Sequence, residues 1–109
     1  MNGFVYLLLE VNQHGEESHK IGISKNDPKL RKKNLQTGNS NKIDVLKTYY
    51  SPHYKKIEQW LHGKYSNKKT EADNEWFILS NEDVMSFDDT CKKIEDTINF
   101  LKKENCFYK

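Results

Sequence analysis

The longest apolar run in the chain is FVYLLL, residues 4–9. Its length and its β-branched and aromatic residues are typical of a central β-strand. The run is too short to cross a membrane. The N-terminus also lacks the basic start and long apolar stretch of a signal peptide. We therefore expect an intracellular protein of the cytoplasm or host nucleus, built around a sheet.

The remaining pattern predicts two more strands and three helices. HKIGIS and IDVLKTYY alternate in hydropathy as strands do. Asp27-Pro28 and Ser51-Pro52 are typical helix starts, and Gly38 is a stop for the first of these helices. Apolar residues repeat at helical spacing from 80 to 105, where Ser80 and Asp83 resemble a capping box. EWFIL is either a strand or a buried extended segment. We predict one α+β domain over 1–109, with a small three-stranded mixed or antiparallel sheet flanked by helices in the order β-β-α-β-α-α.

The charges are strongly partitioned, although the formal net charge is only +2. Residues 20–69 carry thirteen lysines and arginines against three acids, whereas residues 1–19 and 70–109 are both net acidic. Such a basic middle favours a surface that faces a polyanion. The alternative is a lysine-rich solvated face without a partner.

Strand alternation places Lys20 and Gly22 on one face of their strand, and we expect Tyr6 of the first strand to share that face. A glycine inside a strand loses packing and gains nothing unless another group must come close. A tyrosine hydroxyl beside a bare glycine is a plausible small catalytic concavity. The alternative is a β-bulge glycine next to a core tyrosine.

Two further positions stand out chemically. Arg31 is the only arginine in the chain, and its planar fork matches two phosphate oxygens in a way that lysine does not. Glu58 stands among lysines and shares a helix face with His62, four residues on. This pair fits a divalent ion or a phosphate contact, and equally a surface pair without function.

Taken in order, GFVYLL, HKIGIS, DPKLRKKNLQTGN, IEQWLHGKY and NEWFIL resemble the GIY-YIG endonuclease superfamily. The similarity is to its phage and large-DNA-virus branch, which reads KIG in place of YIG, and it covers about residues 3–79. The segment 80–105 is the C-terminal amphipathic helix. The chain departs from the family in three ways: Lys20 replaces the second tyrosine, NDPKLR is one residue longer than the usual motif, and Leu35 stands where some members have His or Tyr.

The resemblance implies a single-metal phosphodiesterase site. It assigns the attacking water to Tyr6, the scissile phosphate to Arg31, and one weakly held Mg²⁺ or Mn²⁺ to Glu58. The full set of implied catalytic residues is Tyr6, Lys20, Gly22, Arg31 and Glu58, with His62 and Asn74 as accessory candidates. The lysines expected to contact nucleic acid are Lys25, Lys32, Lys33, Lys55 and Lys56.

The function we expect is a metal-dependent DNA endonuclease of low intrinsic sequence specificity. Two alternatives stay open. One is a non-catalytic nucleic-acid-binding module of the same fold. The other is a protein-interaction module that docks a partner, or a second copy, through the C-terminal helix or through Trp60 and Trp76.

Overall fold

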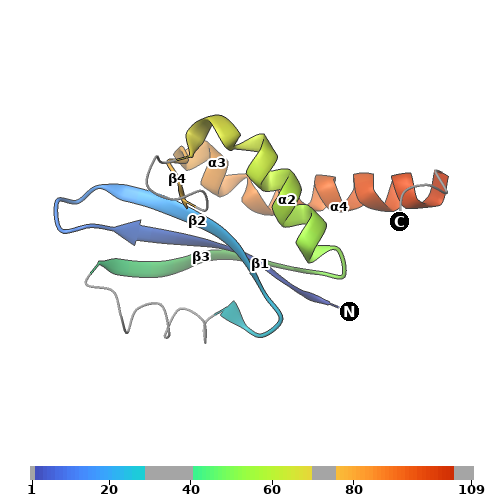
Figure 1. Cartoon of the computed structure of the whole chain (residues 1–109), viewed down its shortest axis with the longest axis horizontal. Helices are drawn as coiled ribbons and strands as arrows, with labels where there is room; N and C mark the ends of the chain where they lie inside the picture. The colour runs from blue at the N-terminus through green and yellow to red at the C-terminus, as the bar shows by residue number, and fades with distance from the viewer. Residues whose placement is uncertain (1, 29–40, 70–75, 105–109) are drawn as a thin grey trace.

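A four-stranded antiparallel sheet forms the centre of the molecule (Figure 1). The computed structural model describes residues 2–28, 41–69 and 76–104. The strands lie in the order β3-β1-β2-β4, and they are β1 (Gly3–Val11), β2 (Glu17–Ser24), β3 (Lys42–Ser51) and β4 (Trp76–Phe77). The predicted α+β class is confirmed, and the two-residue β4 adds a strand to the three predicted.

The predicted central strand is β1, which pairs with β3 on one side and β2 on the other. β1 and β2 form a hairpin whose connection turns at Gly15, where a φ of 79° favours glycine. Their register is continuous and places Tyr6 opposite Gly22. The one irregularity among these pairs lies between β1 and β3, where Leu46 is an extra residue between the partners of Leu7 and Leu8. Gly22 is therefore not a bulge residue.

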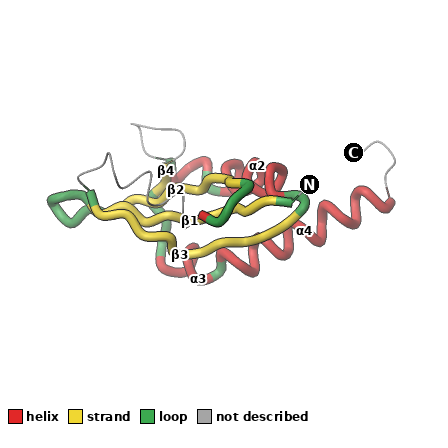
Figure 2. Tube along the Cα trace, turned by 90° about the horizontal axis from the view of Figure 1, so that it is seen from below, coloured by secondary structure: helices red, strands yellow, loops and turns green. Residues whose placement is uncertain are grey.

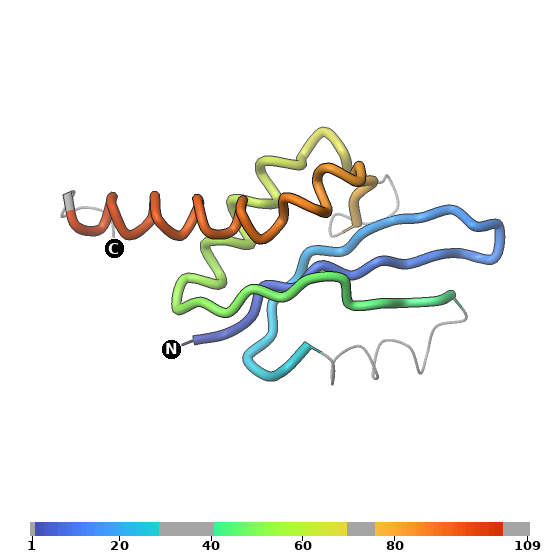
Figure 3. The backbone as a smooth tube through the Cα atoms, turned by 180° about the vertical axis from the view of Figure 1, so that it is seen from behind, coloured from blue at the N-terminus to red at the C-terminus, as the bar shows by residue number. Residues whose placement is uncertain are grey.

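The described helices are α2 (Tyr54–Lys64), α3 (Asn81–Met85) and α4 (Phe87–Glu104), with a short 3-10 turn, η1 (Ser66–Lys68). α2 and α4 lie on the same side of the sheet (Figures 1 and 2). Seen from behind, α4 crosses α2 and continues past the end of the sheet (Figure 3). This arrangement gives the sheet one face covered by these two helices, which we call the helix face. The opposite face we call the Tyr6 face.

The helix face holds the main core. Val5, Leu7 and Ile21 from the sheet pack there with Ile57 and Leu61 of α2. The apolar stripe of the C-terminal segment joins the same core, through Phe87, Cys91, Ile94 and Ile98. The helix stripe that suggested a docking surface thus packs largely inside the chain itself.

A carboxylate fastens α4 to the end of β3. Glu95 accepts hydrogen bonds from the Tyr49 hydroxyl, at 2.9 Å, and from the Ser51 hydroxyl. Burial and the neighbouring Glu95 raise the pKa of Tyr49 well above its ordinary value. The phenol therefore stays protonated and keeps donating throughout the neutral range.

Helix boundaries differ from the predictions in two places. The second helix begins at Tyr54 rather than at Ser51-Pro52, because Ser51 still pairs with β1 and its hydroxyl accepts from the His53 amide. The single helix predicted over 80–105 is two helices separated at Ser86, and α4 ends at Glu104. The Ser86 hydroxyl donates to the Glu82 carbonyl, a local bond that competes with regular helix geometry.

Two other predicted features have different outcomes. The capping box at the start of α3 is confirmed, because Ser80 and Asp83 exchange side-chain and backbone hydrogen bonds. The first predicted helix, from Asp27 to Gly38, falls almost entirely on residues 29–40, outside the described part of the chain. Across the three described ranges, no helix is long and apolar enough to cross a membrane.

Candidate functional site

Tyr6 and Gly22 form one packed unit on the Tyr6 face. A Cβ atom on Gly22 would lie 2.5 Å from the Tyr6 hydroxyl oxygen and 2.6 Å from the ring carbon that bears it. No side chain fits in that space, so the close approach that explains the glycine is the approach of Tyr6 itself. Tyr6 is 1% exposed and packs with Leu8 and Ile43. The predicted closeness of these two residues is present, and the tyrosine is fully buried.

Lys20 lies two residues before Gly22 and pairs across strands with Trp76 of β4. Its ammonium nitrogen lies 5.9 Å from the centre of the Trp76 ring, within range of a cation–π contact. Alternation puts Lys20 on the Tyr6 face with Gly22. Lys20 therefore supplies a positive charge on the strand that also carries the glycine.

α2 brings Glu58 and His62 to the same strand. The Nε2 atom of His62 lies 2.9 Å from the carbonyl oxygen of Ile21, the residue between Lys20 and Gly22. The His62 ring also meets Phe77 edge-on, with 5.1 Å between ring centroids. Because a carbonyl oxygen only accepts, Nε2 is the donor in this contact. His62 thus anchors α2 against β2, and Glu58 lies one helical turn before this anchor, half-buried on the same side of the helix.

Few groups that could hold a metal ion gather here. Within the ranges that the structure describes, no cluster of three or more His, Cys, Asp or Glu side chains is arranged to bind one. A single carboxylate such as Glu58 suits a hard divalent ion that keeps water and phosphate oxygens as its other ligands. The residues present therefore fit a loosely held ion and do not form a protein-only metal cage.

The predicted basic residues fall into two groups. Arg31, Lys32 and Lys33 lie outside the described residues, as does the accessory candidate Asn74. The described members are Lys25, exposed just after β2, and Lys55 and Lys56 in the first turn of α2. The two helix lysines line a pocket of about 370 Å³ with Pro52, His53 and Tyr54.

A further lysine, Lys68, forms an ion pair inside the fold. Lys68 of η1 forms an ion pair with Asp83 of α3, with 2.5 Å between its ammonium nitrogen and a carboxylate oxygen. Burial alone would raise the pKa of Asp83, but hydrogen bonds from Lys68 and Ser80 outweigh it and hold that pKa below its ordinary value. Lys68 therefore joins η1 to α3.

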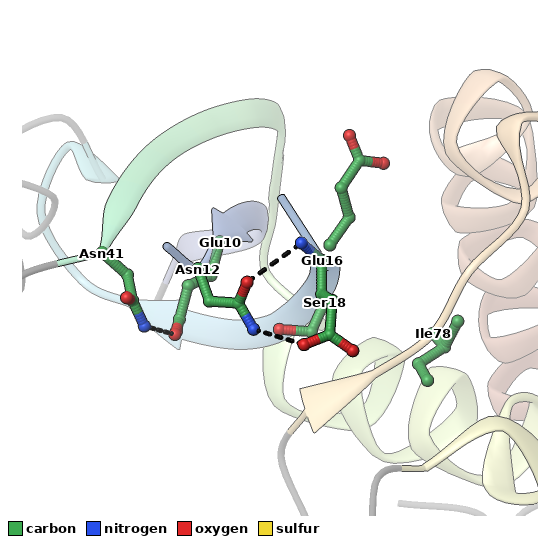
Figure 4. A pocket seen from close by; sticks show the side chains of 7 residues that line it. Glu10, Asn12, Glu16, Ser18, Asn41 and Ile78 are labelled. Atoms are coloured by element: carbon green, nitrogen blue, oxygen red, sulfur yellow. Dashed lines mark hydrogen bonds between the residues drawn. The ribbon is translucent and has the colours of Figure 1, made fainter. Parts of the chain in front are cut away.

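The opposite end of the hairpin is acidic. A pocket of about 260 Å³ is lined there by residues that include Glu10, Glu16 and Glu17 (Figure 4). Asn12 organises it, because its amide donates to Glu16 at 2.9 Å while its carbonyl accepts from the Glu16 backbone. The Asn41 amide donates to Glu10 in the same way. These carboxylates repel a polyanion, so this end is unsuited to nucleic acid.

Two aromatic residues near the candidate site did not emerge from the sequence. Phe4 and Tyr50 face each other across β1 and β3, with ring centroids 4.9 Å apart. The consecutive tyrosines 49 and 50 could have predicted an aromatic residue on this face, because successive residues of a strand point to opposite faces of the sheet. Tyr49 bonds to Glu95 on the helix face, which leaves Tyr50 on the Tyr6 face.

Comparison with protein families identifies a related domain. The T5orf172 domain model matches residues 3–98. Searches of curated proteins and of solved structures found no match to the chain. The matched range contains every residue predicted for the catalytic and accessory sites.

Proposed function

The chain belongs to the T5orf172 domain family, a nuclease-type domain, and from this premise we propose that it is a metal-dependent endonuclease that hydrolyses DNA phosphodiester bonds. The mechanism we propose is of the GIY-YIG type, with little intrinsic sequence specificity. One observation of the structure supports the proposal beyond the family assignment. The His62 contact with Ile21 ties the helix that bears Glu58 to the strand that bears Lys20 and Gly22.

Phosphodiester hydrolysis needs a positioned water and neutralisation of charge on the phosphoryl oxygens. We assign the water to Tyr6. Its hydroxyl is enclosed against Gly22 and so has a fixed position. That suits orienting a water more than exchanging protons with bulk solvent. Gly22 contributes by leaving the space that the phenol needs.

Charge neutralisation is assigned to several cations. Lys20 provides one from the sheet, and Arg31 is proposed as the clamp on the scissile phosphate. Glu58 is the residue that would hold Mg²⁺ or Mn²⁺, which when bound supplies further positive charge at the phosphate. His62 is a positioning residue in this scheme, because its ring fixes α2 and does not need to touch the substrate.

The test is nicking of supercoiled plasmid by purified protein with Mg²⁺, Mn²⁺ or EDTA. Glu58→Gln removes the charge and keeps the shape, and we expect it to slow cleavage on the order of 100-fold. The matched control is Glu82→Gln, an exposed carboxylate on α3 that has no part in the proposed site, and this variant should cut like the wild type. If wild type and Glu58→Gln nick equally, a contaminant is cutting and the assignment fails.

A non-catalytic binding module is the second candidate, and the deep burial of Tyr6 favours it. It predicts no cleavage with any of these metals. It also predicts salt-sensitive DNA binding that Glu58→Gln leaves equal or tighter, because a negative charge is removed from a surface that meets phosphate. The nicking and binding assays together separate the two candidates.

A further inference from the structure

An exposed aromatic surface adjoins the candidate site. Phe4 of β1 and Tyr50 of β3 are opposite each other in register, and their rings are tilted by 54°. Tyr50 is 58% exposed, although it is a large aromatic side chain in a regular strand. We call these two residues the aromatic pair. Buried aromatics stabilise a core, whereas this pair leaves ring surface open to solvent.

The aromatic pair lies directly beside Tyr6 and Gly22. Phe4 is two residues before Tyr6 in β1, on the same face, which corresponds to about 7 Å along the strand. Its partner in β2 is Ser24, and the partner of Tyr6 is Gly22. The aromatic pair and the Tyr6–Gly22 unit are thus successive steps along one face, separated by about the length of one extended nucleotide.

Residues 24–28 and 50–56, at the ends of β2 and β3, include Lys25, Lys55 and Lys56, and Asp27 is the one acid among them. Lys25 follows Ser24 at the end of β2. After Tyr50, the chain passes through Ser51 into the pocket lined by His53, Lys55 and Lys56. No carboxylate is among the residues that line this pocket. Exposed aromatic surface bordered by lysines complements a polynucleotide, whose bases have apolar faces and whose backbone is anionic.

We propose that the aromatic pair is a stacking platform for an unpaired base of single-stranded nucleic acid, with Lys25, Lys55 and Lys56 meeting the adjoining backbone. This inference rests on the proposed function and narrows its substrate. Bases in a duplex are stacked on their neighbours and do not offer a free face, so a platform of this kind selects nucleotides that are already unpaired. The cleaved phosphate would then lie next to a single-stranded nucleotide.

The experiment measures binding separately from cleavage. Fluorescence anisotropy in EDTA compares a labelled oligothymidine with a blunt duplex of equal length, at one fixed salt concentration. Tyr50→Ala should weaken binding of the oligothymidine about 5- to 100-fold, the range expected for losing one base–aromatic stack. Binding of the duplex should change less than twofold. Tyr50→Trp should restore binding of the oligothymidine, because an aromatic surface is what the site requires.

A matched control is available on α4. Phe100 is 62% exposed and lies on the C-terminal helix, so Phe100→Ala should leave both affinities unchanged. Equal binding of oligothymidine by wild type and Tyr50→Ala would overturn the inference, as would an equal loss for duplex and single strand. A selective loss supports the platform even if the plasmid assay shows no cleavage. The two proposals therefore fail by different results.

Discussion

The two faces of the sheet are built from the same strands and carry different kinds of residues. On the helix face, alternate residues such as Val5, Leu7 and Ile21 are fully buried under α2 and α4. On the Tyr6 face, the intervening residues include Tyr6, Lys20 and Gly22, together with the exposed Tyr50. The comparison indicates that the helix face carries the main core, whereas the Tyr6 face combines a smaller buried cluster, formed by Tyr6, Leu8 and Ile43, with the exposed Tyr50.

The largest stability effect should come from the helix face. Leu61→Ala empties a fully buried position of α2, and such truncations cost about 2–5 kcal/mol of unfolding free energy. Tyr50→Ala on the Tyr6 face should cost less than about 1 kcal/mol, because most of that side chain already contacts solvent. Urea denaturation of both variants measures the difference. If Leu61→Ala and Tyr50→Ala lost similar unfolding free energy, the two faces would not differ in their contribution to stability.

Gly22→Ala tests the packing of the Tyr6 face. The new methyl group would meet the Tyr6 hydroxyl at 2.5 Å, so we expect a loss of about 1–3 kcal/mol in unfolding free energy. Gly63→Ala is the matched control, because a Cβ there meets no atom within 4 Å. In its helix this change should stabilise the protein by about 0.5–1 kcal/mol. A Gly22→Ala protein as stable as the wild type would show that Tyr6 moves away readily.

A smaller, pH-dependent effect should come from His19, which lies under the helix face. Its side chain is buried, and its Nδ1 atom lies 3.4 Å from the Leu79 amide, which donates to it. Burial lowers the pKa of His19 below its ordinary value of 6.5, although Glu17 and Asp83 oppose the shift. Folding thus favours the neutral ring. Its contribution is complete above pH 6.5 and is lost as the pH falls through the lower pKa of the folded state.

Thermal melts between pH 7.5 and pH 5 measure this contribution. The wild type should lose melting temperature as the pH falls across that range. His19→Gln lacks the titrating ring, and its melting temperature should fall less over the same interval. If the two proteins lose melting temperature in parallel, other groups dominate the pH dependence and the buried ring is not its source.

Period-two alternation predicted much of the Tyr6 face. It placed Lys20 and Gly22 on one face of β2 because strand geometry fixes which residues of a strand share a face, and the β1–β2 register then sets Tyr6 opposite Gly22. It did not show that the Tyr6 ring itself fills the space above Gly22, since that depends on how the two strands pair. The four-residue spacing of Glu58 and His62 gave their common helix face. It could not identify the Ile21 carbonyl as the partner of His62, because that contact joins residues 41 apart in sequence.

Two other features could not be predicted from local sequence patterns, for similar reasons. The interruption at Ser86 coincides with one side-chain hydrogen bond, from the Ser86 hydroxyl to the Glu82 carbonyl, within an otherwise regular apolar repeat. Phe4 and Tyr50 read as ordinary strand residues, and only the assembled sheet shows that the tyrosine is left uncovered. Exposure is a property of the tertiary arrangement, whereas propensity and periodicity are properties of short segments.

The central claim is that Glu58 of α2 and Gly22 of β2 belong to one metal and phosphate site. Paramagnetic broadening by Mn²⁺ tests it directly, using ¹⁵N-labelled protein bound to an oligonucleotide with a hydrolysis-resistant backbone. The account predicts that the amide signals of Glu58 and Gly22 lose intensity together at low Mn²⁺, while those of α4 persist. Broadening centred on Glu10 and Glu16, or on Glu58 with Gly22 unaffected, would contradict it.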